Sequence, residues 1–456
     1  MKSCIVEDNK PNISQRDFAD ISLLIDKISN KSLGTLAKEG VFVFPKTIEQ
    51  SDDLDNDLYV IKKINGYYNT TNVMGFLGFE DQQIIIRSRF SNCVGNDRYK
   101  DYFFLYVFRT VLDLPNVINL NTIADYKSSL FNFLIFLFPF YLKRALRKGA
   151  FKEYKNVSYN DYSVKGIIDI QKHIVTNNPF IGKISCKRRE FSYDNDLMQL
   201  IRHTIEFIAR TKFSDKILYD VKNEIKIIKE LTLSYSQSER KKLIVKNRLN
   251  HIKHLYFQEY SDLQQLCLMI LEYTHHGIGF GNKSIYGILF DGSWFWEEYI
   301  NRLIKDNFYH PMNRKNVGRQ WLFDKGNSQR EGLIYPDFIG NNVSCRVVGD
   351  AKYKPLSNIR RLDYFQLLSY MLRFDAKTGF FFYPDSSSEL DSEIYRLNQG
   401  VSYFENTFKT REDIRIIKVG FKVPNNNDNY ELFCFEMKRS EEMFIFKLRT
   451  FFCIDR

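Results

Sequence analysis

The sequence predicts an α/β protein built from several domains. Its 456 residues correspond to two or three domains, at about 100–200 residues each. Hydrophobic residues make up 44% of the chain and aromatic residues 16%, which excludes wholesale disorder because disordered chains are poor in such residues. In the last third, helical and strand patterns alternate, as they do in a sheet flanked by helices.

Residues 1–120 form the first predicted domain, which is small, mixed and β-containing. An amphipathic stretch at Phe18–Ile28 is followed by short apolar runs that predict strands, and the last two of these form a hairpin. The strands are Val41–Phe44, Leu58–Ile64, Met74–Phe79 and Gln83–Arg87.

Residues 121–285 form a second, mainly helical region. Leu130–Leu142 leads into a basic turn and Gly149, which is typical of a helix C-terminus. Because a membrane span needs about 20 apolar residues, we expect this shorter stretch to be a buried helix. Further helices are expected at Leu197–Phe213, Ile217–Leu231 and Leu263–His275, with the charged Ser238–Asn250 as a connection and Asp194 as a helix cap.

Residues 286–456 form the third predicted domain, with one sheet flanked by helices. It begins with a helix at Ser293–Lys305, and a turn at Gly340-Asn341-Asn342 separates the first two strands. The expected strands are Leu333–Ile339, Val343–Tyr353, Gly379–Tyr383, Ile414–Lys422 and Leu432–Met437, with a helix at Asn358–Phe374.

Charge and cysteine usage favour an intracellular protein that can bind a polyanion. Lys and Arg number 66 against 55 for Asp and Glu, a net charge of +11, which suits nucleic acid without requiring it. The seven scattered cysteines include no CxxC pair, which indicates free thiols in a reducing compartment. The N-terminus has no apolar signal-peptide core, so we expect a cytoplasmic protein without a membrane association.

Two acids and a lysine on neighbouring predicted strands form the most informative pattern. Asp350 and Lys352 are two residues apart, so their side chains share one face of their strand. Asp337 follows Pro336 near the end of the preceding strand. Carboxylates can hold Mg²⁺ against a phosphate, and a lysine can orient the attacking water and stabilise developing charge.

This pattern resembles the PD-(D/E)xK nuclease core, whose signature Asp337, Asp350 and Lys352 match. The resemblance implies an accessory glutamate on the preceding helix, for which we favour Glu297 over Glu298, so the candidate metal ligands are Asp337, Asp350 and Glu297. Gln366 is a candidate accessory catalytic residue one helical turn from Tyr370. The alternative is that Asp350 and Lys352 form an exposed salt bridge.

Four segments in order resemble McrC, the nuclease subunit of McrBC modification-dependent restriction systems. They are Trp296–Ile300 (W-E-E-Y-I), Tyr335–Phe338 (Y-P-D-F), Gly349–Lys354 (G-D-A-K-Y-K) and Asp363–Tyr370 (D-Y-F-Q-L-L-S-Y). Arg147–Tyr154, Val164–Asp169 and Arg189–Asn195 follow the same family pattern, and the resemblance covers roughly residues 58–385. Ser88-Arg89-Phe90 departs from it, because many relatives have a Pro-Lys pair there.

The resemblance implies a Mg²⁺-dependent DNA endonuclease that works with a separate McrB-like AAA+ GTPase on double-stranded DNA carrying modified cytosine, such as 5-methylcytosine. The sequence contains no G-x-x-x-x-G-K-[ST] phosphate loop, as expected if another chain hydrolyses the nucleotide. The N-terminal region resembles the part of the family that docks in the partner's ring.

Five basic residues are candidate DNA-phosphate ligands: Arg314, Lys315, Arg319, Arg360 and Arg361. Phosphate contacts position DNA without reading its sequence, so we expect the partner to recognise the modified base. Three alternatives remain open: the basic runs are merely solvated faces, the chain is a stand-alone restriction or repair nuclease, or it is a non-catalytic DNA-binding scaffold.

Overall fold

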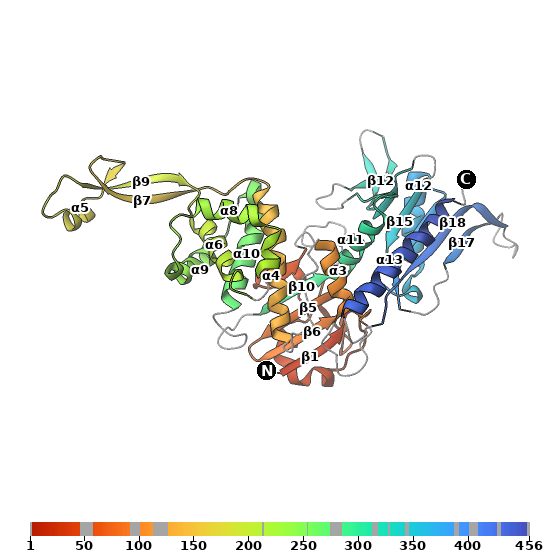
Figure 1. Cartoon of the computed structure of the whole chain (residues 1–456). Coiled ribbons are helices and arrows are strands. Elements are labelled where there is room, and N and C mark those ends of the chain that lie inside the picture. The colour runs from red at the N-terminus through yellow and green to blue at the C-terminus, as the bar shows by residue number, and fades with distance from the viewer. Residues whose placement is uncertain are drawn as a thin grey trace. The chain divides into compact units, whose positions relative to one another are not determined.

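The protein divides into two compact units (Figure 1). The first contains residues 1–114, 119–122 and 279–456, and the second contains residues 115–118 and 123–278. The first unit therefore combines residues of the first and third predicted domains. The computed structural model describes residues 2–45, 58–91, 101–112, 126–211, 214–252, 254–273, 285–311, 318–326, 329–342, 346–386, 392–400, 409–425 and 430–453.

A five-stranded sheet in the first unit combines strands from distant parts of the chain. Its order is β1 (Lys2–Glu7), β6 (Gln82–Arg87), β5 (Val73–Phe79), β10 (Tyr286–Asp291) and β2 (Phe42–Phe44). β5 and β6 form the predicted hairpin. β10 lies among residues assigned to the third domain, yet it pairs antiparallel with β5 and parallel with β2. Its central residues are all buried, as the continuous apolar run of a strand covered on both faces requires.

Short helices and a second hairpin complete this part of the unit. They are η1 (Gln15–Ile21), α1 (Ser22–Ile28), α2 (Leu33–Lys38), β3 (Ile61–Ile64), β4 (Tyr67–Thr70) and α3 (Tyr102–Leu112). Phe18 and Leu24 pack in one core with Leu77 of β5 and Leu289 of β10. The amphipathic stretch predicted at Phe18–Ile28 thus covers the sheet with its apolar side.

A second sheet of six strands lies in the same unit and carries the candidate chemistry. Its order is β11 (Phe308–Tyr309), β14 (Phe338–Gly340), β15 (Val347–Ala351), β16 (Thr378–Asp385), β18 (Lys409–Lys422) and β17 (Glu393–Gln399). β15, β16 and β18 run parallel, whereas β14 and β17 run antiparallel to their neighbours.

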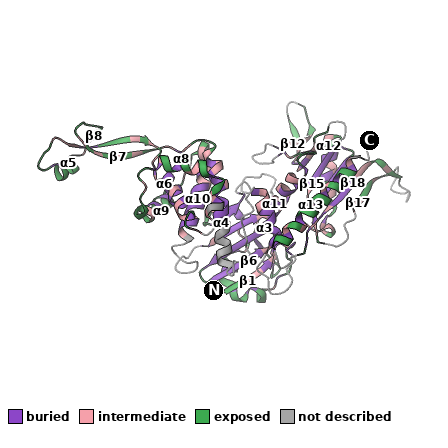
Figure 2. Cartoon of the chain, viewed as in Figure 1, coloured by how far each residue is buried: buried purple, intermediate pink, exposed green. Residues whose placement is uncertain are grey.

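Helices cover both faces of the six-stranded sheet. They are α11 (Gly292–Ile304), α12 (Arg361–Phe374) and α13 (Tyr430–Cys453). Phe381 of β16 packs in one cluster with Leu367 of α12, whereas the ring of Phe382 lies 5.8 Å from that of Phe444 in α13. Because consecutive strand residues face opposite sides, α12 and α13 cover opposite faces. Figure 2 shows the strands buried between them, which confirms the predicted α/β class.

The predicted strand Leu333–Ile339 is wrong, because it is interrupted between Tyr335 and Asp337. Its first half belongs to β13 (Arg330–Ile334), which pairs with β12 (Gln320–Asp324) in a separate two-stranded sheet. Its second half is β14, which begins only at Phe338. Pro336 lacks the N–H that a continuous ladder would need.

The strand predicted at Leu432–Met437 is also wrong, because these residues lie within helix α13. Phe433, Met437, Phe444 and Leu448 are buried. Their spacing of four or seven residues places them on one side of a helix. A short apolar run is compatible with either a strand or a helix. The spacing of the buried residues over the whole segment is that of a helix.

The second unit contains a helical body. Its helices are α4 (Tyr126–Leu146), α6 (Asp196–Ile208), α7 (Ser214–Tyr219), α8 (Lys222–Leu231), α9 (Arg240–Leu249) and α10 (Gln258–Tyr273), and α10 packs against α4, α6 and α9. The expected buried helix forms part of α4, whereas the expected connection Ser238–Asn250 contains α9. Asn195, not Asp194, caps α6 by accepting a hydrogen bond from Met198 N at 3.0 Å. In the described part of the chain, no helix combines the length and hydropathy of a membrane span.

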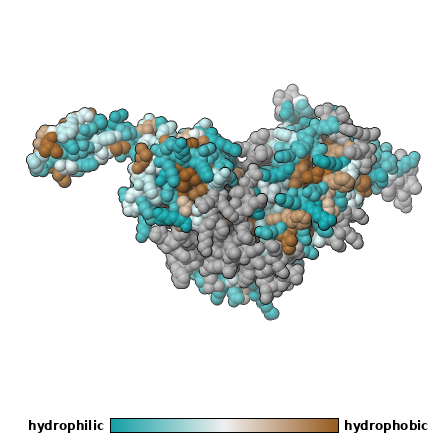
Figure 3. Space-filling model, viewed as in Figure 1, coloured by the Kyte–Doolittle hydropathy of each residue, from teal (hydrophilic) through white to brown (hydrophobic). Residues whose placement is uncertain are grey.

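A β-arm projects from this helical body, and the sequence did not predict it (Figure 1). It consists of β7 (Glu153–Asp161), β8 (Ile167–Ile168), α5 (Ile170–Thr176) and β9 (Ile184–Ser192), with β9 between β7 and β8. Large apolar side chains at its free end are exposed, including Ile167, Ile170, Ile174, Val175, Phe180 and Ile181. Hydrophobic residues are visible on the arm in Figure 3.

The tight pairing of β5 with β10 predicts a strong effect of Gly75→Ala. Gly75 has a φ of +129°, and a Cβ there would lie 2.2 Å from the carbonyl oxygen of Ile288. We expect the variant to lose about 2–4 kcal/mol of unfolding free energy through strain and overpacking, measured by urea unfolding.

Gly34→Ala is the matched control. Gly34 lies in α2, and a Cβ there would have its nearest neighbouring atom, Ser32 Oγ, at 4.0 Å. It should stabilise the protein by about 1 kcal/mol through higher helix propensity. An unchanged unfolding free energy for Gly75→Ala would contradict the close approach of the two strands.

Candidate active site

Asp350 and Lys352 lie at the end of the central strand β15. Asp350 pairs in register with Phe381 of β16 and is 1% exposed. The backbone N–H of Lys352 donates to Phe382 O at 2.9 Å, so the pairing continues one residue beyond β15. The Nζ of Lys352 lies 2.7 Å from Asp350 Oδ2. The two side chains therefore share one face, as predicted, but they form a largely buried ion pair rather than an exposed one.

Asp337 joins this pair from the neighbouring strand. It directly precedes β14, and the pairing of Phe338 with Gly349 sets its position relative to β15. Its Oδ2 accepts a hydrogen bond from the backbone N–H of Ala351 at 2.8 Å. This bond fixes the Asp337 carboxylate to the backbone of the residue that separates Asp350 from Lys352 in the sequence.

Glu297 approaches the group from helix α11. The indole Nε1 of Trp296 donates to Phe382 O at 3.0 Å, which fixes this turn of the helix against β16. His310 links Glu297 to Asp337, because its Nδ1 lies 2.7 Å from Asp337 O and its Nε2 lies 3.6 Å from Glu297 Oε1. Sequence reasoning missed His310, which is far from the motif along the chain and follows the two-residue strand β11.

A polar chain from helix α12 orients Lys352. Its Nζ donates to Gln366 Oε1 at 2.8 Å, Gln366 Nε2 donates to the Tyr370 hydroxyl at 2.7 Å, and that hydroxyl donates to Tyr335 O at 2.9 Å. Asp363 Oδ1 also lies 3.7 Å from Lys352 Nζ. Tyr370 is 2% exposed, so it is both a core residue and a member of this series of hydrogen bonds.

Burial and neighbouring carboxylates together shift the pKa values of the site residues. Burial, followed by the charges of Glu298, Asp291 and Asp350, raises the pKa of Glu297 to about 8. Burial and the charges of Glu297 and Asp350 raise the pKa of Asp337 well above its ordinary value. Burial by itself would lower the pKa of Lys352, but the carboxylates of Asp350 and Asp337 outweigh it and raise that pKa.

The donor set suits Mg²⁺ without enclosing it. Asp350 Oδ2 is buried and, among the described residues, has no well-aligned hydrogen bond besides its ion pair. No three His, Cys, Asp or Glu side chains in the described part of the chain form a complete metal-binding group. Mg²⁺ typically binds one or two carboxylates and keeps several waters, so Asp337 and Asp350 fit such a partial shell. The ligand set that adds Glu297 stays a prediction.

Three of the five predicted DNA-binding residues lie among the described residues. Arg314 and Lys315 lie outside the described residues. Arg319 precedes β12. Arg360 is the N-cap residue of α12, and its backbone N–H donates to Asp363 Oδ2 at 2.7 Å. The guanidinium of Arg361 lies 5.1 Å from the ring centroid of Phe365. Their contact with DNA stays a prediction.

Glu297 should make the stability of the protein pH-dependent. In the unfolded chain a glutamate titrates near pH 4.3, whereas burial and neighbouring acids raise the folded pKa of Glu297 to about 8. Between these values the folded state binds more protons, so stability falls as pH rises. We expect Glu297→Gln to weaken the fall in melting temperature between pH 5 and pH 8.

The control is Glu80→Gln on an exposed turn, which should retain the pH dependence of the wild type. Identical melting curves for the wild type and Glu297→Gln across this range would show that burial and neighbouring acids do not raise the pKa of Glu297.

Comparison with known proteins identifies the family. The family model of the McrBC 5-methylcytosine restriction system component matches residues 68–384, more than half of the chain. A chain in the refined half-complex of a tetradecameric assembly of Thermococcus gammatolerans McrB AAA+ hexamers with bound McrC is 14% identical, with a TM-score of 0.50 over 99% of this chain and 100% of that chain.

A chain of the Thermococcus gammatolerans McrBC complex determined by cryo-EM is also 14% identical, with a TM-score of 0.32 over 67% of this chain and 87% of that chain. No curated protein matches the sequence. The match of the family model includes Glu297, Asp337, Asp350, Lys352 and Gln366. The chain therefore belongs to the McrBC 5-methylcytosine restriction system component family, as its sequence motifs predicted.

Proposed function

We propose that this chain is the DNA endonuclease subunit of a modification-dependent restriction system. It hydrolyses phosphodiester bonds with Mg²⁺ and acts with a separate McrB-like AAA+ protein that hydrolyses GTP. The observation that carries the proposal is the meeting of Asp337, Asp350 and Lys352 at the end of β15. The family match and the resemblance of the fold to McrC support it.

Each polar side chain of the site has a distinct task in this reaction. Asp337 and Asp350 are the oxygen ligands for Mg²⁺, which when bound supplies positive charge that stabilises the attacked phosphate. Lys352 acts as a charged donor rather than a base, because the neighbouring acids raise its pKa. It orients the attacking water and stabilises developing negative charge. Gln366 holds the Lys352 ammonium in place through its 2.8 Å hydrogen bond, and Glu297 is an accessory acid.

Recognition and motor activity belong to the partner in this proposal. The McrC chain of similar fold is bound to McrB AAA+ hexamers, and the present sequence has no phosphate loop of its own. DNA carrying modified cytosine is the proposed substrate. Arg314, Lys315, Arg319, Arg360 and Arg361 are proposed to hold its phosphates, which carry no base information.

Two surfaces are candidates for docking the partner. The family resemblance favours the N-terminal region, residues 1–120. The free end of the β-arm is the alternative favoured by exposure, since Ile167 is 81% and Val175 84% exposed. A cluster of exposed apolar side chains of this kind typically marks a protein interaction site.

Replacing Asp350 or Lys352 tests the nuclease assignment. We expect Asp350→Asn and Lys352→Ala each to reduce cutting of methylated DNA by at least about 100-fold, measured with an McrB-like partner, GTP and Mg²⁺. GTP hydrolysis by the partner should be unchanged, because neither residue touches the nucleotide in this proposal.

Lys438→Ala is the matched control. Lys438 belongs to a second E-x-K sequence, Glu436-Met437-Lys438, which lies on helix α13. Undiminished cutting by Asp350→Asn and Lys352→Ala would favour the scaffold alternative, and cutting without GTP and partner would favour a stand-alone nuclease.

Replacing exposed apolar residues at the free end of the β-arm with serine tests whether the partner docks there. We expect the double variant Ile167→Ser, Val175→Ser to weaken binding to the partner at least about tenfold by removing exposed apolar contacts, measured by calorimetry. Its melting temperature should be unchanged, since both side chains are exposed. Unchanged affinity would instead favour residues 1–120.

A further inference from the structure

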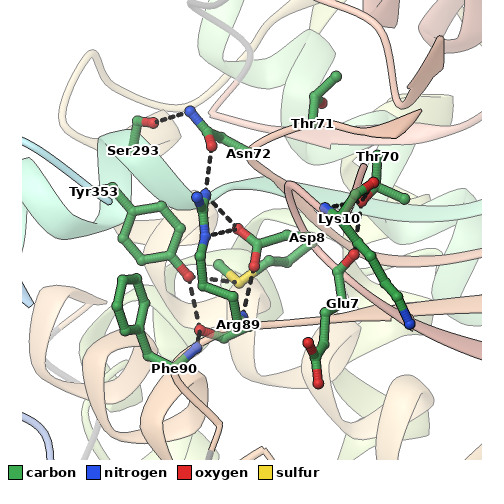
Figure 4. Close-up of polar contacts among 12 residues, drawn as sticks. Glu7, Asp8, Lys10, Thr70, Thr71, Asn72, Arg89, Phe90, Ser293 and Tyr353 are labelled. Atoms are coloured by element: carbon green, nitrogen blue, oxygen red, sulfur yellow. Dashed lines mark hydrogen bonds and ion pairs between the residues drawn. The ribbon is translucent and has the colours of Figure 1, made fainter. Parts of the chain in front are cut away.

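A buried ion pair connects the ends of β1 and β6 in the five-stranded sheet. Arg89 donates to the carboxylate of Asp8 from its backbone N–H (2.5 Å), its Nε (3.2 Å) and its Nη2 (2.9 Å). The Asp8 side chain is fully buried and that of Arg89 is 11% exposed. Figure 4 shows the guanidinium beside this carboxylate. A buried pair of this kind has a large desolvation cost, so stability alone is a weak reason for its presence.

One side of this cluster holds the residue next to Lys352. The Tyr353 hydroxyl lies 2.7 Å from Ser88 Oγ. Its ring is 4.8 Å from the Arg89 guanidinium and 5.2 Å from the ring of Phe90. Tyr353 is 4% exposed. Lys352 contacts Asp350 and Gln366 instead, so these consecutive residues anchor the chain in two different environments.

The other side of the cluster holds the start of α11. Arg89 Nη2 donates to Asn72 Oδ1, and Asn72 Nδ2 donates to Ser293 Oγ at 3.1 Å. The backbone N–H of Gly292 donates to Asn72 O at 2.8 Å. Ser293 lies four residues before Glu297 on the same helix, about one turn away. Figure 4 shows Arg89 between Tyr353 and Asn72.

We propose that this cluster, comprising Asp8, Asn72, Ser88, Arg89, Ser293 and Tyr353, positions Lys352 and Glu297 for catalysis. We call it the anchor cluster. The proposal rests on the nuclease function proposed above. The anchor cluster acts through the backbone at Tyr353 and at the start of α11. A displacement of a catalytic group by about 1 Å can cost about 100-fold in rate, so a small shift at these two points is sufficient.

Two substitutions remove the same hydrogen bond from opposite sides. Tyr353→Phe keeps the ring and Ser88→Ala keeps the backbone, and each eliminates the 2.7 Å contact between the two hydroxyls. We expect each to lower kcat for DNA cleavage about 5- to 20-fold, with KM for DNA and the partner's GTP hydrolysis unchanged. Ser88 Oγ also accepts from Phe90 N at 3.2 Å, and the Tyr353 hydroxyl also donates to Met74 Sδ at 3.5 Å. Because the two single variants share one lost interaction, the loss of kcat in the double variant should be smaller than the product of the two single losses.

Thr70→Val is the matched structural control. Thr70 is a buried residue of β4, in the two-stranded sheet of the same unit, where its hydroxyl donates to Glu7 O at 2.7 Å and accepts from Lys10 N at 2.8 Å. Figure 4 shows it apart from Tyr353. Valine has nearly the same shape, so this variant also loses buried hydrogen bonds. It should lower the melting temperature and leave kcat unchanged.

Asp350→Asn separates the two proposals. If Asp350→Asn abolishes cutting while Tyr353→Phe and Ser88→Ala cut at the wild-type rate, the positioning role is overturned and the nuclease function stands. The same conclusion follows if Thr70→Val loses as much kcat as Tyr353→Phe and Ser88→Ala do. Multiplicative losses in the double variant would also overturn the positioning role. If Asp350→Asn cuts like the wild type, the nuclease function fails and the positioning role fails with it.

Discussion

The ion pair between Asp350 and Lys352 is the interaction on which the candidate site depends. It lies at the end of a strand that is covered by helices on both faces of its sheet, with Asp350 1% exposed. Charges in such a place are costly unless they are paired and hydrogen-bonded. Gln366 and Asp363 supply the additional contacts to Lys352, while Asp337 is held by the backbone of Ala351. The charged group is thus held in one arrangement by two strands and a helix.

The carboxylates outnumber the ammonium in this arrangement. Burial raises the pKa values of both Glu297 and Asp337, the charge of Asp350 adds to both shifts, and the charge of Glu297 adds to the shift of Asp337. This repulsion is the electrostatic condition that a divalent cation relieves, since a bound cation favours the ionised form of every nearby acid. Carboxylate crowding therefore opposes stability without a cation and supports the Mg²⁺-dependent chemistry that we propose.

The first unit is organised so that one region supports another that is distant along the chain. β10 pairs between β5 and β2 and continues directly into α11, so the helix that carries Glu297 begins at the C-terminal end of an interior strand of the five-stranded sheet. Tyr353 makes the second connection, directly after Lys352. The five-stranded sheet is thus connected to the candidate site at two points, the start of α11 and Tyr353. These two points constrain the positions of Glu297 and Lys352.

Features that depend on residues close together along the chain could be predicted from the sequence. The alternation of side chains placed Asp350 and Lys352 on one face, helical periodicity located α11 and α12, and the ordered motifs identified the family. Tertiary structure decided the pairing of β10 with β5 and β2, the interruption at Pro336, the helical state of Leu432–Met437, and the contacts of His310 and Asp363. The reason is physical. Local periodicity is set by a few consecutive residues, whereas strand pairing and burial depend on contacts between distant segments. The sequence of one segment does not say which distant segment it will contact.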